Sequence, residues 1–205
     1  ALANPKATFI HAGKQRGQQE EVQAEIYAWY LRLRDLGGPI VRLKSGDPMI
    51  FGRGGEELEF LARHGFSVEV VPGVSAVTAA PALAGIPLTY RGVAASFTVV
   101  AGHRQSVQEL DWRAYRHIDT IVVLMGVDNR AIIAANLINA GRPATEPVAF
   151  VQRVSTERER VIESTLEAVA HGEVEVEAPA VFVVGEVVRL RSSMRPRNAV
   201  EAVKH

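Results

Sequence analysis

The sequence predicts an α/β protein with two domains, a mainly parallel sheet in the N-terminal domain and a mixed sheet in the C-terminal domain. Three observations favour this fold class: short apolar runs alternate with helical patterns, glycines separate them, and a polar stretch at about residues 102–111 divides two halves. A chain of 205 residues suits one large domain or two small ones, since a domain takes roughly 100–200 residues. We therefore expect domains at residues 1–103 and 104–205.

The first half alternates strand and helix patterns. Val22, Ile26, Trp29 and Leu33 repeat along one face of a helix that Gly37 ends. The expected strands are residues 8–11, 40–43, 68–71 and 95–100, and the expected helices are residues 22–36, 56–64 and 75–84. Because strands that alternate with helices are joined by right-handed crossovers, this pattern predicts a mainly parallel sheet.

The second half keeps the apolar strands but spaces them differently. The expected strands are residues 120–125, 147–151, 180–184 and 187–190, and the expected helices are residues 129–140 and 164–170. Only a few residues around Gly185 separate the last two strands. So short a connection favours antiparallel pairing, and with it a mixed sheet.

The composition excludes several functional classes. The 23 basic and 23 acidic residues balance, so the chain lacks the basic surplus typical of nucleic-acid binding. It has no cysteine, which excludes disulfides, thiolate metal sites and cysteine nucleophiles and is compatible with a cytoplasmic location. The six histidines show no ligand spacing, so we expect no metal. No apolar run reaches the roughly 18 residues of a membrane span, and we expect no membrane partner.

The strongest local signal is the stretch from residue 41 to 57. A strand pattern ends there, a Gly-Asp-Pro turn follows, and a glycine-rich loop opens a helix with two glutamates in its first turn. Ligands of open α/β sheets bind beyond the carboxyl ends of strands, and glycine lets the backbone approach them closely. The alternative is a capped helix whose acids complement its dipole. The loop fits neither the dinucleotide fingerprint nor the phosphate-binding loop pattern.

A second loop has the same plan. Residues 70–76 run from a strand through a Pro-Gly turn into a helix, and Ser75 and Ala76 are small enough to let a planar ligand lie against the backbone. The alternative for Ser75 is an ordinary helix N-cap.

Three polar residues elsewhere follow expected strands. Lys14 and Arg16 stand in a basic loop after the strand at residues 8–11, where they hold an anionic substrate or form a solvated turn. His103 follows the strand at residues 95–100, whereas His64, His117 and His171 suit surface or helix-end positions.

Taken together, these motifs resemble the tetrapyrrole methylases. The segments that carry the resemblance run in order from about Leu2 to Leu190: Gly13-Lys14, residues 41–57, 70–76, 84–92 and 100–103, Leu124-Met125-Gly126 and residues 183–188. The resemblance implies two α/β domains with S-adenosylmethionine bound between them and S-adenosylhomocysteine as the product. It assigns the cofactor to Ser45, Gly46, Asp47, Ile50, Ser75, Ala76, Met125 and Val154.

The resemblance also implies a reaction and an assembly. The family methylates two pyrrole carbons of uroporphyrinogen III to give precorrin-2, on the way to sirohaem and cobalamin, and it usually forms homodimers. Lys14 matches the family's proposed proton donor or substrate anchor. Arg16, Arg53, Arg91 and His103 lie in or beside the loops and are the expected ligands of this anionic tetrapyrrole, although Arg53 alternatively braces its own helix.

The sequence departs from the family pattern in several places. A glycine loop that follows the family's opening strand, and the proposed base near it, have no counterpart here, and we expect a longer parent protein. Gln15 and Tyr90 replace an arginine and a histidine, while Ser45 and Val154 replace glycines. Two alternatives stay open: a methylase of another tetrapyrrole or related substrate, and a methylase-like module without catalysis.

Overall fold

The computed structural model describes residues 4, 6–12 and 19–194, and the chain divides into two compact units. Unit 1 comprises residues 1–73 and unit 2 comprises residues 74–205. The expected domain boundary at residues 103 and 104 lies within unit 2, where the strands on its two sides pair with each other. The division into domains at that boundary stays a prediction, whereas the compact units divide after Gly73.

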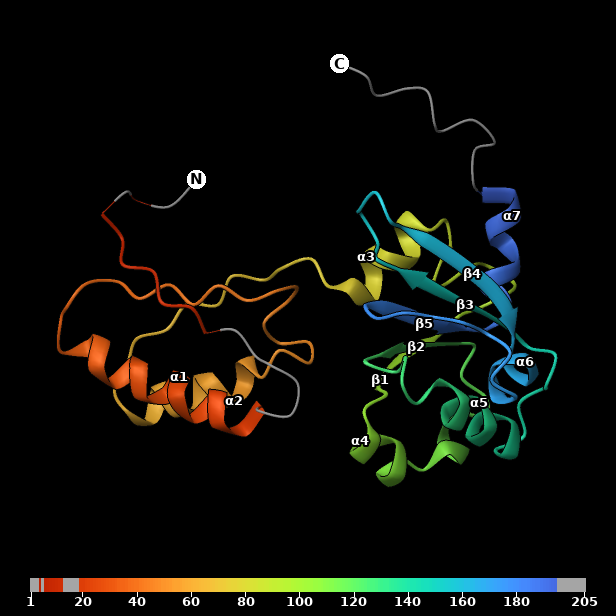
Figure 1. Cartoon of the computed structure of the whole chain (residues 1–205), viewed down its shortest axis with the longest axis horizontal. Helices are drawn as coiled ribbons and strands as arrows, with labels where there is room; N and C mark the ends of the chain where they lie inside the picture. Colours follow the sequence, from red (N-terminus) through yellow and green to blue (C-terminus); the bar gives the residue numbers. More distant parts are fainter. Residues whose placement is uncertain (1–3, 5, 13–18, 195–205) are drawn as a thin grey trace, which may run out of the picture. The chain divides into compact units, whose positions relative to one another are not determined.

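Two helices form the core of unit 1 (Figure 1). Helix α1 (Gln19–Arg34) and helix α2 (Gly54–Arg63) lie side by side, and their buried cluster contains Ile26, Tyr30 and Leu61. The regular spacing of apolar residues along α1 builds the face that packs on α2, which is why both helices are predictable from the sequence.

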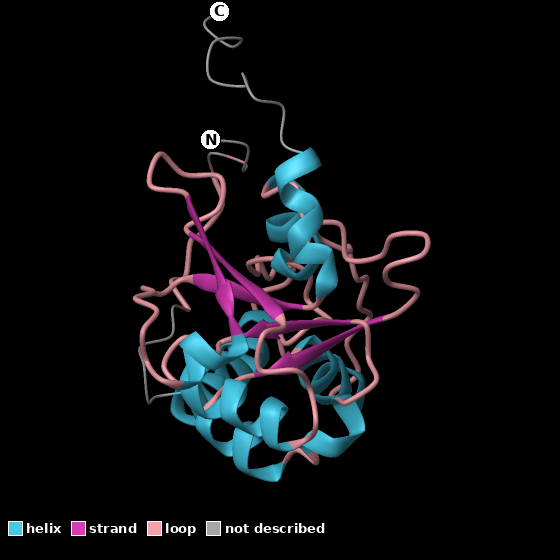
Figure 2. Cartoon of the chain, turned by 90° about the vertical axis from the view of Figure 1, so that its right-hand side faces the viewer, coloured by secondary structure: helices cyan, strands magenta, loops and turns pink. Residues whose placement is uncertain are grey.

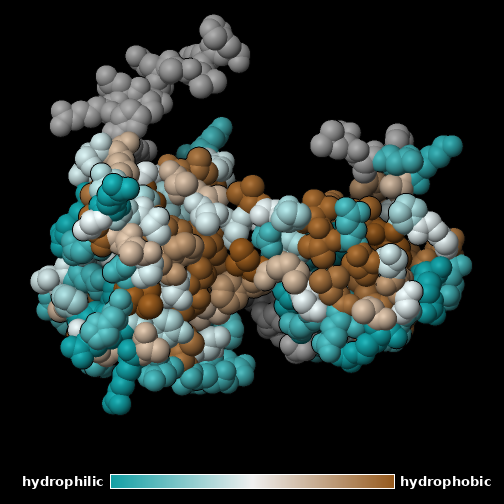
Figure 3. Space-filling view, turned by 180° about the vertical axis from the view of Figure 1, so that it is seen from behind, coloured by the Kyte–Doolittle hydropathy of each residue, from teal (hydrophilic) through white to brown (hydrophobic). Residues whose placement is uncertain are grey.

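The strands expected in unit 1 are absent from its described residues. Residues 8–11, 40–43 and 68–71 pair with no neighbouring strand, so these three predictions are wrong for this structure. Apart from the half-buried Ile10, their large apolar side chains are exposed instead, and Figure 3 shows apolar side chains gathered on one face of unit 1. An apolar run favours a strand, but it does not supply the neighbouring strand with which the backbone groups must pair.

Unit 2 contains a five-stranded mixed sheet, which confirms the prediction for the second half of the chain. The strands are β1 (Phe97–Ala101), β2 (Thr120–Leu124), β3 (Pro147–Gln152), β4 (Arg160–Thr165) and β5 (Ala180–Val184). Their order is β1-β2-β5-β3-β4, with β1 and β2 parallel and the other neighbours antiparallel. Because β2 and β3 both run antiparallel to β5, their carboxyl ends lie at the same edge of the sheet.

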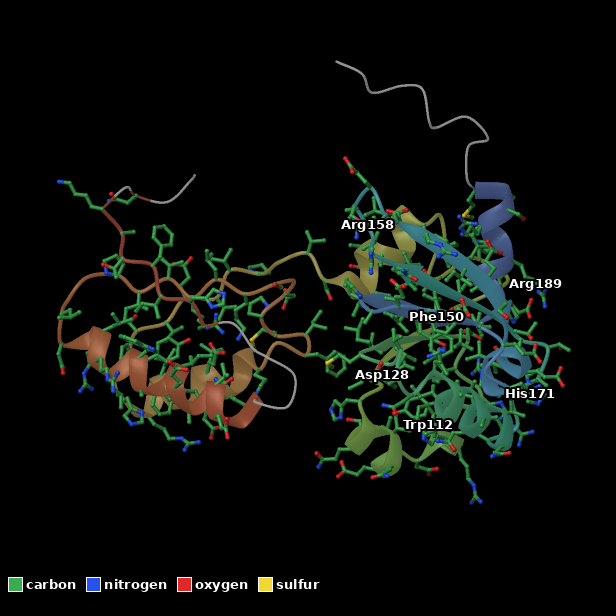
Figure 4. All side chains as sticks on the ribbon, viewed as in Figure 1. Trp112, Asp128, Phe150, Arg158, His171 and Arg189 are labelled. Carbon is green, nitrogen blue, oxygen red and sulfur yellow. The ribbon has the colours of Figure 1, made fainter. Side chains whose placement is uncertain are left out.

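The sheet separates two hydrophobic cores. In β2, Ile121 and Val123 face one core, while Val122 between them faces the other, since successive side chains of a strand point to opposite faces. Phe150 of β3 stacks on Phe182 of β5 within the first core, with ring centroids 4.4 Å apart (Figure 4). Figures 1 and 2 show helices on both sides of this sheet.

Helices close both cores. They are α3 (Ala76–Leu83), α4 (Arg104–Glu109), α5 (Arg130–Asn139), α6 (Leu166–Ala170) and α7 (Arg191–Met194), with 3-10 turns η1 (Trp112–Tyr115) and η2 (Glu186–Leu190). Two sequence predictions fail here. Residues 187–190 form η2 rather than a strand, and the expected linker contains α4, which buries Val107 although its other residues are polar. In the part of the chain that the structure describes, no helix has both the length and the apolar character needed to span a membrane.

Candidate functional site

The glycine-rich loop of unit 1 is shaped by Asp47. Its Oδ1 accepts a hydrogen bond from the backbone N–H of Met49 at 2.8 Å, and its Oδ2 accepts one from the N–H of Gly73 at 3.0 Å. A Cβ on Gly73 would lie 2.2 Å from the carbonyl oxygen of Gly46. The two turns therefore touch through their backbones, and the exposed Ser45 stands beside this contact.

A buried carboxylate on α2 anchors the chain where it enters this loop. Glu57 is 4% exposed and accepts hydrogen bonds from Lys44 Nζ at 2.5 Å and from Tyr30 Oη at 2.7 Å. Arg42 Nε lies 3.6 Å from its Oε2. Burial opposes the charge of Glu57, but the hydrogen bonds from Lys44 and Tyr30 and the two nearby cations outweigh it and hold the pKa of Glu57 below its ordinary value. Burial, followed by the hydrogen bond to Glu57, raises the pKa of Tyr30.

Arg53 braces the start of α2. Its guanidinium Nε bonds both carboxylate oxygens of Glu56, at 3.0 and 2.9 Å. This geometry matches the bracing role that the sequence leaves open, and its assignment to the substrate stays a prediction.

A groove of about 910 Å³ lies on unit 2 at the sheet edge where β2 and β3 end and β5 begins. Ala76, Met125 and Val154, three residues that the resemblance assigns to the cofactor, line it. The other apolar lining residues are Leu124, Val151 and residues 178–181. A largely apolar concave surface of this size, with a few polar groups, is typical of a small-molecule site.

Ser75 is not among the residues that line this groove. It is 7% exposed, and its Oγ accepts a hydrogen bond from the N–H of Val77 at 3.2 Å, so that it caps α3 as the alternative interpretation expects. The cap fixes the start of α3, where Ala76 meets the groove.

Of the other predicted substrate ligands, His103 and Arg91 lie in unit 2. His103 caps α4: its Nδ1 accepts from the N–H of Ser106 at 3.3 Å, and its Nε2 lies 2.9 Å from Ser106 Oγ. Arg91 is exposed in a turn of unit 2. Lys14 and Arg16 lie outside the described residues.

Sequence reasoning missed the charged rim of the groove. Arg153, Glu157 and Arg158 line it, and Arg153 Nη2 bonds Glu177 Oε2 at 2.7 Å. Figure 4 shows Arg158 on the loop that joins β3 to β4, and its side chain is exposed. The signal in the sequence that could have indicated this rim is a polar loop after the strand β3. Its place at the groove depends on β5 lying between β2 and β3, which no short stretch of sequence reveals.

Comparisons with known proteins agree with this fold. Residues 1–170 match the family model described as tetrapyrrole (corrin/porphyrin) methylases. The chain is 40% identical to the uroporphyrinogen-III C-methyltransferase of Synechocystis sp. over 97% of this chain and 78% of that protein. It is 41% identical to the siroheme synthase of Methylococcus capsulatus over 95% of this chain, but it spans only 42% of that protein's length.

A solved structure of a relative is similar to this chain. The crystal structure of uroporphyrin-III C-methyl transferase from Thermus thermophilus complexed with S-adenyl homocysteine is similar, with a TM-score of 0.75 and 46% sequence identity. The similarity covers 85% of this chain and 76% of that chain. It confirms an α/β fold like that of the tetrapyrrole methylases, whereas the arrangement in two domains stays a prediction. In the described part of this chain, no cluster of three or more histidine, aspartate or glutamate side chains offers a metal site.

Proposed function

We propose, from the premise that this chain belongs to the tetrapyrrole (corrin/porphyrin) methylase family, that the chain methylates pyrrole carbons of uroporphyrinogen III. S-adenosylmethionine is the methyl donor. The product is precorrin-2, the precursor of sirohaem and cobalamin. The similarity to the Synechocystis enzyme supports this substrate, because it extends over 97% of the chain. The siroheme synthases are longer than this chain, and the proposal therefore concerns methyl transfer alone.

The groove of unit 2 is the observation that carries the proposal. Its volume of about 910 Å³ and its apolar walls suit an adenosyl group, and Ala76, Met125 and Val154 line it. Val154, which stands where the family has a glycine, contributes an apolar side chain to this wall. When bound, S-adenosylmethionine supplies an electrophilic methyl group on its sulfonium, and S-adenosylhomocysteine is the product.

Residues of the chain then have to align the reactants. A pyrrole carbon attacks the methyl group directly, so that catalysis consists mostly of holding donor and acceptor in line. We propose that Ser45, Gly46, Asp47 and Ile50 of the glycine-rich loop bind the cofactor together with the groove residues and with Ser75. Asp47 shapes the loop through its bonds to Met49 and Gly73.

We further propose that cations of the chain bind the substrate's carboxylates. The proposed ligands are Lys14, Arg16, Arg53, Arg91 and His103. Methylation also requires proton transfer in the ring system, which a positioned acid or base assists. Lys14 is the proposed proton donor or substrate anchor. A homodimer and a cytoplasmic location complete the proposal, since the resemblance implies the first and the absence of cysteine is compatible with the second.

A groove-filling substitution tests where the cofactor binds. Ala76→Leu places a larger side chain in the groove, and we expect it to weaken the binding of S-adenosylhomocysteine at least tenfold in isothermal titration. Ala82→Leu is the matched control, because Ala82 is exposed on the same helix but does not line the groove. If the wild-type chain shows no saturable binding at millimolar ligand, the methyltransferase proposal fails. If it binds the cofactor but does not convert uroporphyrinogen III to a dimethylated product, the substrate is another tetrapyrrole.

Lys14→Ala tests the proposed acid or anchor. We expect methyl transfer to fall at least tenfold while the affinity for S-adenosylhomocysteine stays within twofold, because the ammonium acts on the substrate and not on the donor. Lys6→Ala removes another lysine of the same stretch and should leave both quantities unchanged. Equal losses of transfer and of cofactor affinity in the Lys14 variant would contradict this role.

A further inference from the structure

Backbone strain in the described part of the chain occurs in the glycine-rich loop of unit 1 and in the loops that follow β2 and β3 of unit 2. Five residues other than glycine have positive φ there: Phe51 (52°), Arg53 (60°), Met125 (58°), Arg153 (49°) and Ser155 (62°). The first two lie in the glycine-rich loop, the third follows β2, and the last two follow β3. Left-handed backbone is unfavourable for residues with a side chain, and it persists where the surroundings impose it, often at functional sites.

The winding of the loop imposes this conformation at Phe51. The N–H of Gly54 donates to the carbonyl oxygen of Pro48 at 2.9 Å, and a Cβ on Gly54 would lie 2.3 Å from the same oxygen. The N–H of Ile50 donates to the carbonyl oxygen of Asp47 at 3.3 Å. The turn is held from both sides of Phe51, so that the backbone fixes the direction of its Cα–Cβ bond.

The same turn presents three consecutive apolar side chains to solvent. Met49, Ile50 and Phe51 are 53%, 41% and 48% exposed, and none belongs to the buried cluster of α1 and α2. Among the described residues, no aromatic ring stacks on Phe51. A glycine or asparagine would adopt this backbone more readily and would expose less apolar surface. Backbone strain and an exposed aromatic ring therefore coincide at Phe51, and this combination points to a ligand that contacts the ring.

We propose that Phe51 is a specificity-determining residue whose ring packs against a pyrrole ring of the tetrapyrrole substrate. This inference rests on the proposed function and names a contact for its substrate. The carboxylates of such a substrate require cations, but its pyrrole rings offer flat faces that an aromatic side chain contacts well. Because the loop already holds the backbone of Phe51, little backbone entropy is lost when the substrate binds.

Phe51→Gly separates this role from a structural one. Glycine relieves the strain of positive φ, so we expect a melting temperature equal to or above that of the wild type. The affinity for S-adenosylhomocysteine should stay within twofold. The KM for uroporphyrinogen III and the Kd for uroporphyrin III, a stable fluorescent analogue, should both rise about tenfold, which corresponds to about 1.4 kcal/mol. Phe51→Tyr keeps the ring and should keep both values within about threefold.

Leu36→Ala is the control, since Leu36 is 79% exposed in unit 1 but lies outside the glycine-rich loop. It should leave KM and Kd unchanged. The inference is overturned if Phe51→Gly keeps the wild-type Kd, if it lowers the melting temperature and the cofactor affinity together, or if it changes only the oligomeric state in light scattering. A wild-type chain that binds uroporphyrin III without methylating uroporphyrinogen III defeats the proposed function alone, and the ratio of Kd values still decides the role of Phe51. A wild-type chain that neither binds uroporphyrin III nor methylates uroporphyrinogen III defeats both.

Discussion

Glu57→Ala is expected to lower the free energy of unfolding of unit 1 by about 3–5 kcal/mol, the usual cost of removing one partner of a buried ion pair. The carboxylate is 4% exposed, and it is the partner of Lys44 at 2.5 Å and of Tyr30 at 2.7 Å. Alanine would leave the ammonium of Lys44, whose side chain is 11% exposed, without its counter-charge. The variant would also remove the carboxylate that lies 3.6 Å from Arg42 Nε.

The measurement uses the two tryptophans of the chain, one in each unit. In a Trp112→Phe background, the fluorescence of Trp29 on α1 reports urea unfolding of unit 1 alone. Glu56→Ala is the matched control, because Glu56 is the neighbouring glutamate on α2 and its side chain is 52% exposed. We expect that control to lose about 1 kcal/mol or less, as surface ion pairs do. A loss below 1 kcal/mol for Glu57→Ala would mean that water replaces the carboxylate without penalty.

The pH dependence gives an independent check of the same network. The pKa of Glu57 in the folded chain lies below its ordinary value, so its charge adds stability above the pKa of the unfolded chain, about 4.3. That contribution disappears as the pH falls through the lower, folded-state pKa. The stability difference between the wild type and Glu57→Gln should therefore be constant near pH 7 and shrink as the pH falls below about 4. A difference that stays constant into strong acid would contradict the charged state assigned here.

Elements with a regular apolar pattern can be predicted from this sequence, and those that depend on a distant partner cannot. The pattern predicts α1 and β2 because each contains its own signal, a stripe at helical spacing or an unbroken apolar run. It misses β4, because Arg160 and Glu163 interrupt its apolar residues and the strand exists only through its ladder with β3. It wrongly predicts strands at residues 40–43 and 68–71, which are rich in apolar residues but have no strand with which to pair in the described part of the chain.

The site shows the same limit. The small residue Ala76 and the strand end at Met125 can be found from the sequence, and the structure brings them together with Val154 in one groove. The rim residues Arg153 and Arg158 cannot be found in this way, since they reach the groove only because β5 lies between β2 and β3. Chemistry-bearing residue types are visible locally, whereas the cavity that they share is a property of strand order.

Gly73→Ala is expected to disrupt the glycine-rich loop although position 73 lies outside it. The new Cβ would lie 2.2 Å from the carbonyl oxygen of Gly46, so the two turns must move apart. Their separation also removes the hydrogen bond from the N–H of residue 73 to Asp47 Oδ2. Overpacking costs about 1–3 kcal/mol and a hydrogen bond to a charged group contributes about 1.5–3 kcal/mol, so we expect unit 1 to lose about 3–5 kcal/mol.

Gly55→Ala is the control that isolates the steric effect. A Cβ on Gly55 meets nothing within 4 Å, and because the residue lies in α2, alanine should stabilise the helix by about 0.5–1 kcal/mol. If the proposed function holds, Gly73→Ala also weakens S-adenosylhomocysteine binding tenfold or more, because shifts of about 0.5 Å already degrade a binding site. Wild-type stability in Gly73→Ala would show that the turns do not touch. Lower stability with wild-type cofactor affinity would show that the contact holds the fold but that the loop does not bind the cofactor.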